Sequence, residues 1–116
     1  MNQSMTIPEQ VAAIQREAAG DDLMPSRAAE LLTKLAAALL PSCNADIRNA
    51  DMKYNLVYKT CLETVDKANR AKIVAECSPE FEKKREARDR KEEVEALIAS
   101  LKYYLRSYEN EMRLAR

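Results

Sequence analysis

Apolar residues recur at alternating steps of three and four along most of this chain, which is the spacing of one face of an α-helix. In the middle of the chain this row consists of Ile47, Ala50, Tyr54, Val57, Cys61, Thr64, Ala68, Ala71 and Ala75. In the last third it consists of Val94, Ile98, Leu101, Leu105, Tyr108, Met112 and Ala115. Rows this narrow are typical of a coiled-coil seam, so they predict two long helices, at about 44–77 and 79–115.

A single Ser78-Pro79 step separates the two long helices. Ser is a favourable N-cap and Pro fits the first position of a helix. The two helices have nearly equal lengths, so we expect them to form a long antiparallel hairpin that reverses at Ser78. In this register Ala68 faces Arg88. By the same counting, Tyr54 faces Lys102.

The helix expected at 44–77 also has a second apolar face. Its residues are Leu56, Tyr58, Leu62, Val65 and Ile73. Two apolar faces indicate that this helix is contacted from two directions.

Two shorter helices are expected before the hairpin, at about 7–19 and 26–40. Thr6 and Glu9 have the spacing of a capping box at the start of the first. Gly20 supplies its stop, where a left-handed residue is commonly needed. The second helix has a broad row of Leu residues and is expected to end at Pro41, after which Ser42 or Asn44 caps the next helix.

We expect both short helices to pack on the base of the hairpin, the end far from Ser78. The half near Ser78 would then project as a two-helix arm, charged outside and lined with Ala. The chain has one Gly and four Pro and no strand-like alternation. The predicted fold class is therefore all-α, in a single domain over residues 1–116 with residues 1–5 disordered.

Charge and length narrow the possible functions. The 19 basic and 19 acidic residues balance, which argues against a general polyanion binder, because such a protein needs a surplus of Lys and Arg. No apolar run of about 20 residues is present, and the polar start does not resemble a secretory signal. These features predict a soluble, cytoplasmic protein without membrane contact.

The side chains that most enzymes use are scarce. The chain has no His and a single Gly, so zinc sites, Glu-x-x-His di-metal sites and Gly-rich phosphate loops are not expected. Cys43 and Cys61 would lie about 27 Å apart on one helix, too far for a disulfide. Cys61 and Cys77 would lie about 24 Å apart on the same helix, so no pair can form a disulfide and free thiols in a reducing compartment are expected. We expect no catalysis and no cofactor.

Two groups of side chains are candidate binding sites. The first combines Tyr with basic residues, as single-stranded nucleic-acid platforms do; it consists of Lys53, Tyr54, Tyr58, Lys59, Lys102, Tyr103 and Arg106. The second lies in the charge-balanced run 82–93 and would contact a partner protein through Lys83, Lys84, Arg88 and Lys91. The structural alternatives are that Tyr54 and Tyr104 lie in or beside the core with flanking cations, and that the charged run is a solvated helix surface. Tyr103, one position off the apolar row, is the ring expected to be exposed.

Several segments of the second half of the chain resemble small helical proteins encoded by phages and prophages. These segments are Ala68-Asn69-Arg70-Ala71-Lys72, Ser78-Pro79-Glu80-Phe81, Ser100-Leu101-Lys102-Tyr103-Tyr104-Leu105-Arg106 and Glu111-Met112-Arg113. The resemblance implies an accessory protein that acts through protein or nucleic-acid contacts, and it implies no particular binding residues.

The pattern as a whole predicts a non-catalytic helical module for interaction or assembly. Its surplus of apolar faces favours a homo-oligomer, and a two-fold dimer is the commonest arrangement. A monomer in which the short helices cover both faces is the competing arrangement. The alternative function is a single-stranded nucleic-acid-binding accessory factor, of the type used in phage recombination or replication.

Overall fold

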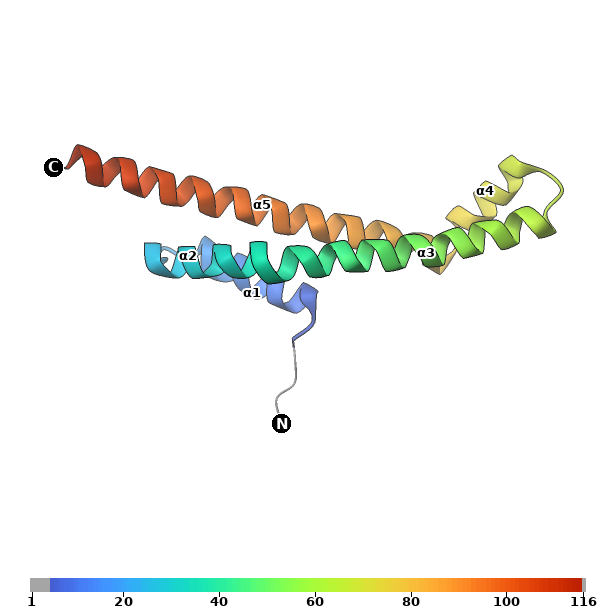
Figure 1. The fold of residues 1–116 in the computed structure, drawn as a ribbon, viewed down its shortest axis with the longest axis horizontal. Coiled ribbons are helices and arrows are strands. Elements are labelled where there is room, and N and C mark those ends of the chain that lie inside the picture. The colour runs from blue at the N-terminus through green and yellow to red at the C-terminus, as the bar shows by residue number, and fades with distance from the viewer. Residues whose placement is uncertain (1–4, 116) are drawn as a thin grey trace. The chain divides into compact units, whose positions relative to one another are not determined.

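The computed structural model describes residues 5–115, and within this range every regular element is helical (Figure 1). The elements are α1 (Ile7–Ala19), α2 (Pro25–Lys34), the π-helical segment η1 (Leu35–Leu39), α3 (Leu40–Thr64), α4 (Ala68–Glu76) and α5 (Pro79–Leu114). The all-α prediction is confirmed. Disorder had been predicted for residues 1–5; residues 1–4 lie outside the described range, and Met5 is an exposed residue that precedes α1.

The chain divides into two compact units, which we describe separately. The first unit comprises Met1–Ser42 and Glu92–Arg116, and so contains α1, α2, η1 and the later part of α5. The second unit comprises Cys43–Lys91, and so contains most of α3, all of α4 and the beginning of α5. A single domain over residues 1–116 stays a prediction.

The start of α1 is capped as its sequence predicts. The hydroxyl of Thr6 accepts a hydrogen bond from the backbone N–H of Glu9 at 3.3 Å and donates to the Glu9 carboxylate at 2.9 Å. At the other end, Gly20 does terminate the helix, but its φ of −73° and ψ of 151° are extended. The prediction of a left-handed stop at Gly20 was therefore wrong, because the chain leaves the helix directly into the turn before α2.

The core of the first unit is built mainly from branched aliphatic side chains. Its residues that are at most 3% exposed are Val11, Ile14, Ala28, Leu31, Leu35, Leu39, Val94 and Leu101. Because these residues come from α1, α2, η1 and the later part of α5, the two short helices do pack on that part of α5, as predicted. The Tyr104 hydroxyl donates to the backbone carbonyl of Leu23 at 2.5 Å, which ties α5 to the turn between α1 and α2.

The helix does not end at Pro41, contrary to the prediction. The elements α2, η1 and α3 follow one another without a gap, and Pro41 lies inside α3. In η1 the N–H of Leu40 bonds to the carbonyl of Leu35, one residue farther than in an α-helix. This shift in the hydrogen-bond ladder comes just before Pro41, where the missing N–H would interrupt the ladder in any case.

The residues expected to cap the third helix are consequently inside it. Asn44 lies within α3, and the hydroxyl of Ser42 donates to the Ala38 carbonyl at 3.0 Å, one turn back along the helix. A side chain that bonds back to the preceding turn is a helix-interior contact rather than an N-cap.

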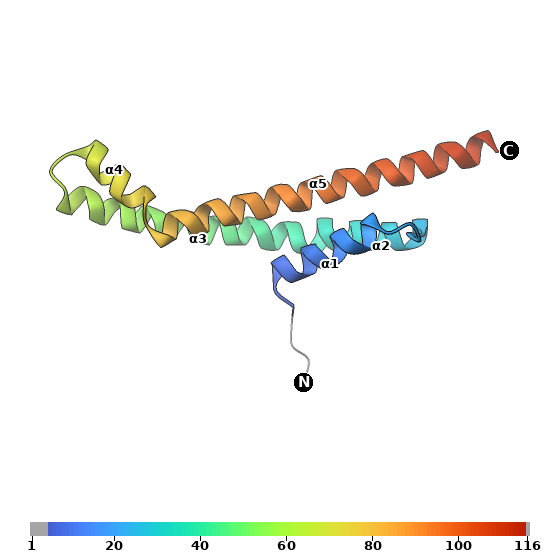
Figure 2. The ribbon, with the colours of Figure 1, turned by 180° about the vertical axis from the view of Figure 1, so that it is seen from behind.

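The predicted helix at 44–77 is also broken, between α3 and α4. Residues 65–67 form a bend, and Lys67 has an extended backbone, with φ −124° and ψ 135°. From this bend α4 runs back along α3, and α5 continues onward after Ser78-Pro79 (Figures 1 and 2). The hairpin thus reverses at residues 65–67, about a dozen residues earlier than predicted.

The Ser78-Pro79 step begins a helix, as predicted, but it does not reverse the chain. The Ser78 hydroxyl accepts from the N–H of Phe81 at 3.2 Å and donates to the Ala75 carbonyl at 2.5 Å. The same side chain therefore finishes α4 and starts α5. A Ser-Pro step of this kind can join two helices at a kink as well as at a full reversal. The prediction assumed the full reversal, and for that reason it was wrong.

Candidate functional site

The aromatic rings of the second unit form a core cluster around Tyr54. Its ring lies 5.4 Å from that of Phe81 and 6.3 Å from that of Tyr58, measured between centroids. The ammonium group of Lys84 sits 4.5 Å from the Tyr54 centroid, in cation–π geometry. Burial raises the pKa of the Tyr54 phenol, and the negative charge of Glu76 raises it further.

Small residues complete this cluster. Cys61 is 9% exposed, and Ala71 and Ala75 are fully buried beside it. These positions belong to the apolar row that the sequence predicted for the middle helix. Fully buried Ala residues let α3 and α4 approach closely, so the second unit has little room for larger side chains.

An ion pair outside the cluster fixes the register of the second unit. Arg88 donates to the Asp51 carboxylate at 2.9 Å across 37 residues. The midpoint of this pair along the chain lies between Asn69 and Arg70, close to the observed bend. The predicted pairing of Arg88 with Ala68 was therefore wrong, because it assumed that the chain reverses at Ser78.

The residues of the predicted nucleic-acid cluster are divided between the two compact units. Lys53, Tyr54, Tyr58 and Lys59 belong to the second unit, whereas Lys102, Tyr103 and Arg106 belong to the first. Tyr54 is only 8% exposed and its ring packs on that of Phe81, so it has no free face on which a base could stack. Tyr103 is 74% exposed, as expected for the outermost ring.

The four basic residues proposed as partner contacts in the charged run differ in their surroundings. Lys83 is exposed and Lys91 is half-buried. Lys84 lies over the Tyr54 ring and Arg88 is paired with Asp51. Two of the four therefore stabilise the second unit itself. The sequence analysis missed these contacts because it predicted the wrong hairpin register.

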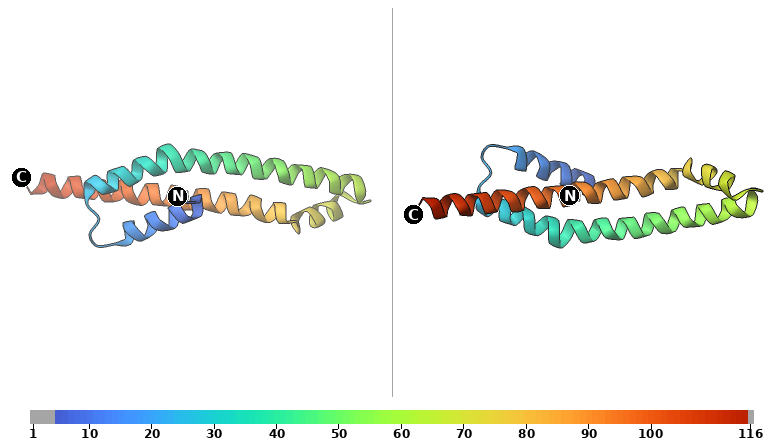
Figure 3. Two further views of the ribbon diagram at one scale, coloured as in Figure 1. Left: turned by 90° about the horizontal axis from the view of Figure 1, so that it is seen from below. Right: turned by 90° about the horizontal axis from the view of Figure 1, so that it is seen from above.

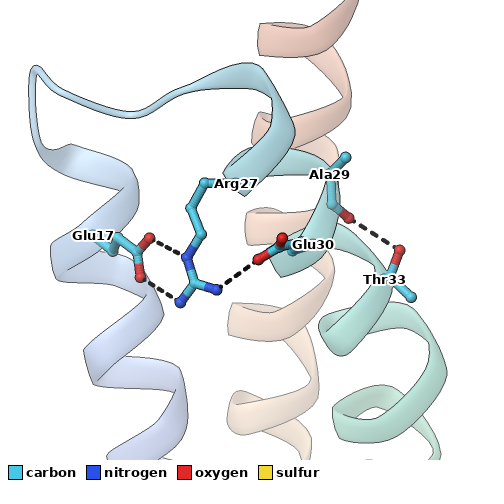
Figure 4. Close-up of polar contacts among 5 residues, drawn as sticks. All are labelled: Glu17, Arg27, Ala29, Glu30 and Thr33. Carbon is cyan, nitrogen blue, oxygen red and sulfur yellow. Dashed lines mark hydrogen bonds and ion pairs between the residues drawn. The ribbon is translucent and has the colours of Figure 1, made fainter.

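The turn between α1 and α2 is held by an ion-pair network (Figure 4). The guanidinium of Arg27 contacts both carboxylate oxygens of Glu17, at 2.5 and 2.9 Å, and also that of Glu30 at 3.0 Å. Hydrogen bonding to Arg27 lowers the pKa of Glu17. A hollow of about 290 Å³ beside this network is lined by Glu17, Gly20, Asp22, Leu23, Met24 and Arg27. The cation in its wall is already matched by two carboxylates, so the network has a structural role.

The apolar row of α5 is largely exposed to solvent in the last turns of the helix. The Tyr104 contact with Leu23 marks the level of the α1–α2 turn, and from residue 108 to residue 115 every side chain is exposed. The row that buries Val94 and Leu101 continues here as Tyr108 and Met112, which are 40% and 46% exposed. We call Tyr108, Met112 and Ala115 the terminal row. The C-terminal end of α5 is seen from two sides in Figure 3.

The second apolar face predicted for the middle helix is also mainly in solvent. Leu56 is 61% exposed, Leu62 43% and Ile73 62%. Tyr58 and Val65 are half-buried against the aromatic cluster. Contact of this face from a second direction is therefore not made within the described part of the chain.

Other chemistry is sparse between residues 5 and 115. Cys43, Cys61 and Cys77 form no disulfide, and the first two are buried while Cys77 is exposed. The described residues contain no group of three or more His, Cys, Asp or Glu side chains placed to hold a metal ion. Over the same range, none of the helices combines the length and apolar character needed to cross a membrane.

Comparison with known proteins adds no relative. The chain matches no protein-family model, no curated protein and no solved structure. The resemblance to phage-encoded helical proteins therefore stays a prediction.

Proposed function

We propose that this protein is a non-catalytic helical interaction and assembly module that associates with further copies of itself. The observation that supports this most strongly is the terminal row of α5. It continues, at unchanged spacing, the row that packs against α1 and α2, and it carries large apolar side chains into solvent.

Burial of this row would be favourable. Removing apolar surface from water stabilises an interface by about 25 cal/mol per Å². The steps of four and three are those of a coiled-coil seam, which another helix with the same spacing can match. A second copy has that spacing because its sequence is identical. The same patch on both partners is the usual basis of a two-fold dimer.

The charges beside the terminal row fit a helical protein better than a nucleic acid. Arg106 and Arg113 are offset by Glu109 and Glu111 on the same turns. A nucleic-acid surface would need a local surplus of cations to release counterions. This balance and the burial of Tyr54 support a helical protein partner, and we keep single-stranded nucleic-acid binding as the second candidate function.

Light scattering over a concentration series tests the proposal. We expect the wild-type mass to rise above the 13.2 kDa of one chain. Tyr108→Ser combined with Met112→Ser should weaken association at least roughly 10-fold, because two anchors of the seam are lost. The matched control is Tyr103→Ser combined with Leu114→Ser, which alters one Tyr and one aliphatic residue on the same helix but off the row.

The control should associate like the wild type. A wild-type mass that stays at one chain at every concentration would overturn self-association, and equal weakening by both double variants would overturn the role of the terminal row. Binding of a labelled single-stranded oligonucleotide at low salt, reduced by Lys102→Ala and Arg106→Ala, would favour the alternative function instead.

A further inference from the structure

The bend between α3 and α4 contains a single residue that favours turns, Asp66. Its sequence, Val65-Asp66-Lys67, contains no Gly, Pro or Asn. Lys67 occupies the N-cap position of α4 and makes no side-chain capping hydrogen bond. The turn between α1 and α2, by contrast, contains Gly20 and Asp22 and is followed by Pro25. Local turn chemistry is therefore weaker at residues 65–67 than in the turn between α1 and α2, and packing contributes more to the reversal.

The apolar row passes through this bend without a change of phase. Cys61 and Ala71 are buried on either side of it, and the intervening positions at the same spacing are Thr64 and Ala68. Both of these are exposed in the observed hairpin. A turn does not require the spacing to persist, but a continuous helix does. The sequence thus specifies a seam that the hairpin interrupts.

Little backbone separates the bent chain from a straight helix. Helical hydrogen bonds continue to Val65, whose N–H bonds to the Cys61 carbonyl at 3.0 Å. They resume at Ala71, whose N–H bonds to the Lys67 carbonyl at 3.0 Å. Straightening would restore the bonds in between and would place Thr64 and Ala68 on the seam.

We infer that the bend is a hinge at which α4 and α5 are exchanged between two copies of this chain. With residues 65–67 helical, α3 and α4 form one helix, and α4 and α5 can no longer fold onto the α3 of their own chain. They pack instead on the α3 of a second copy, which receives the same elements in return. Exchange of identical elements is a low-cost route to a dimer, because every native contact is remade.

The contacts that would be remade identify the second copy as the partner. Tyr54 of one chain would receive Phe81 and Lys84 of the other, and Asp51 would receive Arg88. Each of these contacts is present within one chain of the hairpin. At the centre of the dimer, Thr64 of each copy would face Ala68 of the other, small residues suited to a close approach.

This inference rests on the proposed self-association, but it can fail separately. A dimer formed through the terminal row alone keeps Asp51 and Arg88 paired within each chain. An exchanged dimer pairs them between chains. Mixing chains that carry opposite halves of this ion pair therefore distinguishes the two dimers.

The first experiment mixes the Asp51→Arg chain with the Arg88→Asp chain, refolds them together and counts species by native mass spectrometry. Each variant alone places like charges at this site. In the exchanged mixed dimer both sites regain opposite charges. Random mixing would make the mixed dimer half of all dimers, but we expect it to exceed the two like dimers together by roughly 10-fold. Statistical mixing would overturn exchange and leave self-association standing, whereas absence of any dimer would overturn both.

The second experiment restrains the hinge. Ala68 is the first residue of α4, where Pro is favourable, and Lys67 before it already has the extended backbone that precedes Pro. In a straight helix the same Pro would lie in the interior, so Ala68→Pro in both chains should reduce the mixed dimer roughly 100-fold per hinge. Ala68→Ser, which both forms accommodate, is the matched control. An enriched mixed dimer that survives Ala68→Pro would overturn the straight hinge.

Discussion

The two compact units reach all-helical structures by different means. The first unit packs branched aliphatic side chains from four segments and reverses the chain at a turn containing Gly20 and Asp22. The second unit packs one aromatic cluster against buried Ala residues and reverses the chain at Val65-Asp66-Lys67. In the first unit local turn chemistry and packing favour the same structure. In the second, Asp66 is the single residue of the bend that favours a turn, so packing contributes most to the reversal, which leaves another arrangement of the same contacts open.

The largest expected effect tests the core of the first unit. Leu35 is fully buried in η1, so Leu35→Ala should lower the free energy of unfolding by about 3 kcal/mol, through lost burial and the cavity left behind. Leu56→Ala is the matched control in the second unit, because that side chain is 61% exposed and its loss should cost less than about 0.5 kcal/mol. Urea unfolding followed by circular dichroism measures both. Equal losses of unfolding free energy would contradict the burial of Leu35 and the exposure of Leu56.

A smaller effect is expected at the start of α5, where the second unit does use local chemistry. Ser78→Ala removes the acceptor for the Phe81 N–H and should destabilise the protein by about 1 kcal/mol. Ser78→Gly should cost only a few tenths of a kcal/mol, because Gly is itself tolerated at an N-cap. Urea midpoints and amide exchange at Phe81 report the difference. If both variants behaved like the wild type, packing would hold this junction too.

The smallest effect concerns the pH dependence of the second unit. Burial raises the pKa of Tyr54 above its ordinary value, so the folded state holds this proton more tightly than the unfolded state does. The resulting stabilisation is fully present below the unfolded pKa of about 10 and is lost as pH rises through the folded value. Tyr54→Phe should therefore lose less stability than the wild type between about pH 9 and pH 11.

Thermal unfolding monitored at several alkaline pH values checks this prediction. Tyr103→Phe, at an exposed ring outside the cluster, is the control and should lose stability with rising pH as the wild type does. A Tyr54→Phe slope identical to that of the wild type would show that the aromatic cluster does not discriminate against the phenolate.

Most of the fold was predictable because the spacing of apolar residues is a local property. The buried positions Cys61 and Leu101 follow from it, and the starts of α1 at Thr6 and of α5 after Ser78 follow from capping residues, which are equally local. The prediction failed at Pro41, where the π-helical segment allows the helix to continue past a residue that normally ends one.

The candidate sites were less predictable because they depend on register. Placing the reversal at Ser78 brought Tyr54 to Lys102, whereas the bend at residues 65–67 brings it to Phe81 and Lys84. An error of about a dozen residues in the turn changes every partner across a hairpin. The terminal row was identified as a seam, but its exposure depends on where α1 and α2 stop, which the row itself does not encode.

The sequence by itself determined the helical fold class and most of the apolar faces, because both depend on neighbours three and four positions away. Only the tertiary structure decided where the chain reverses. No residue at 65–67 demands a turn, and the reversal there arises because Tyr54, Cys61, Ala71 and Ala75 are buried together only when α4 lies against an α3. The row of apolar residues does not record whether that α3 belongs to the same chain or to a second copy.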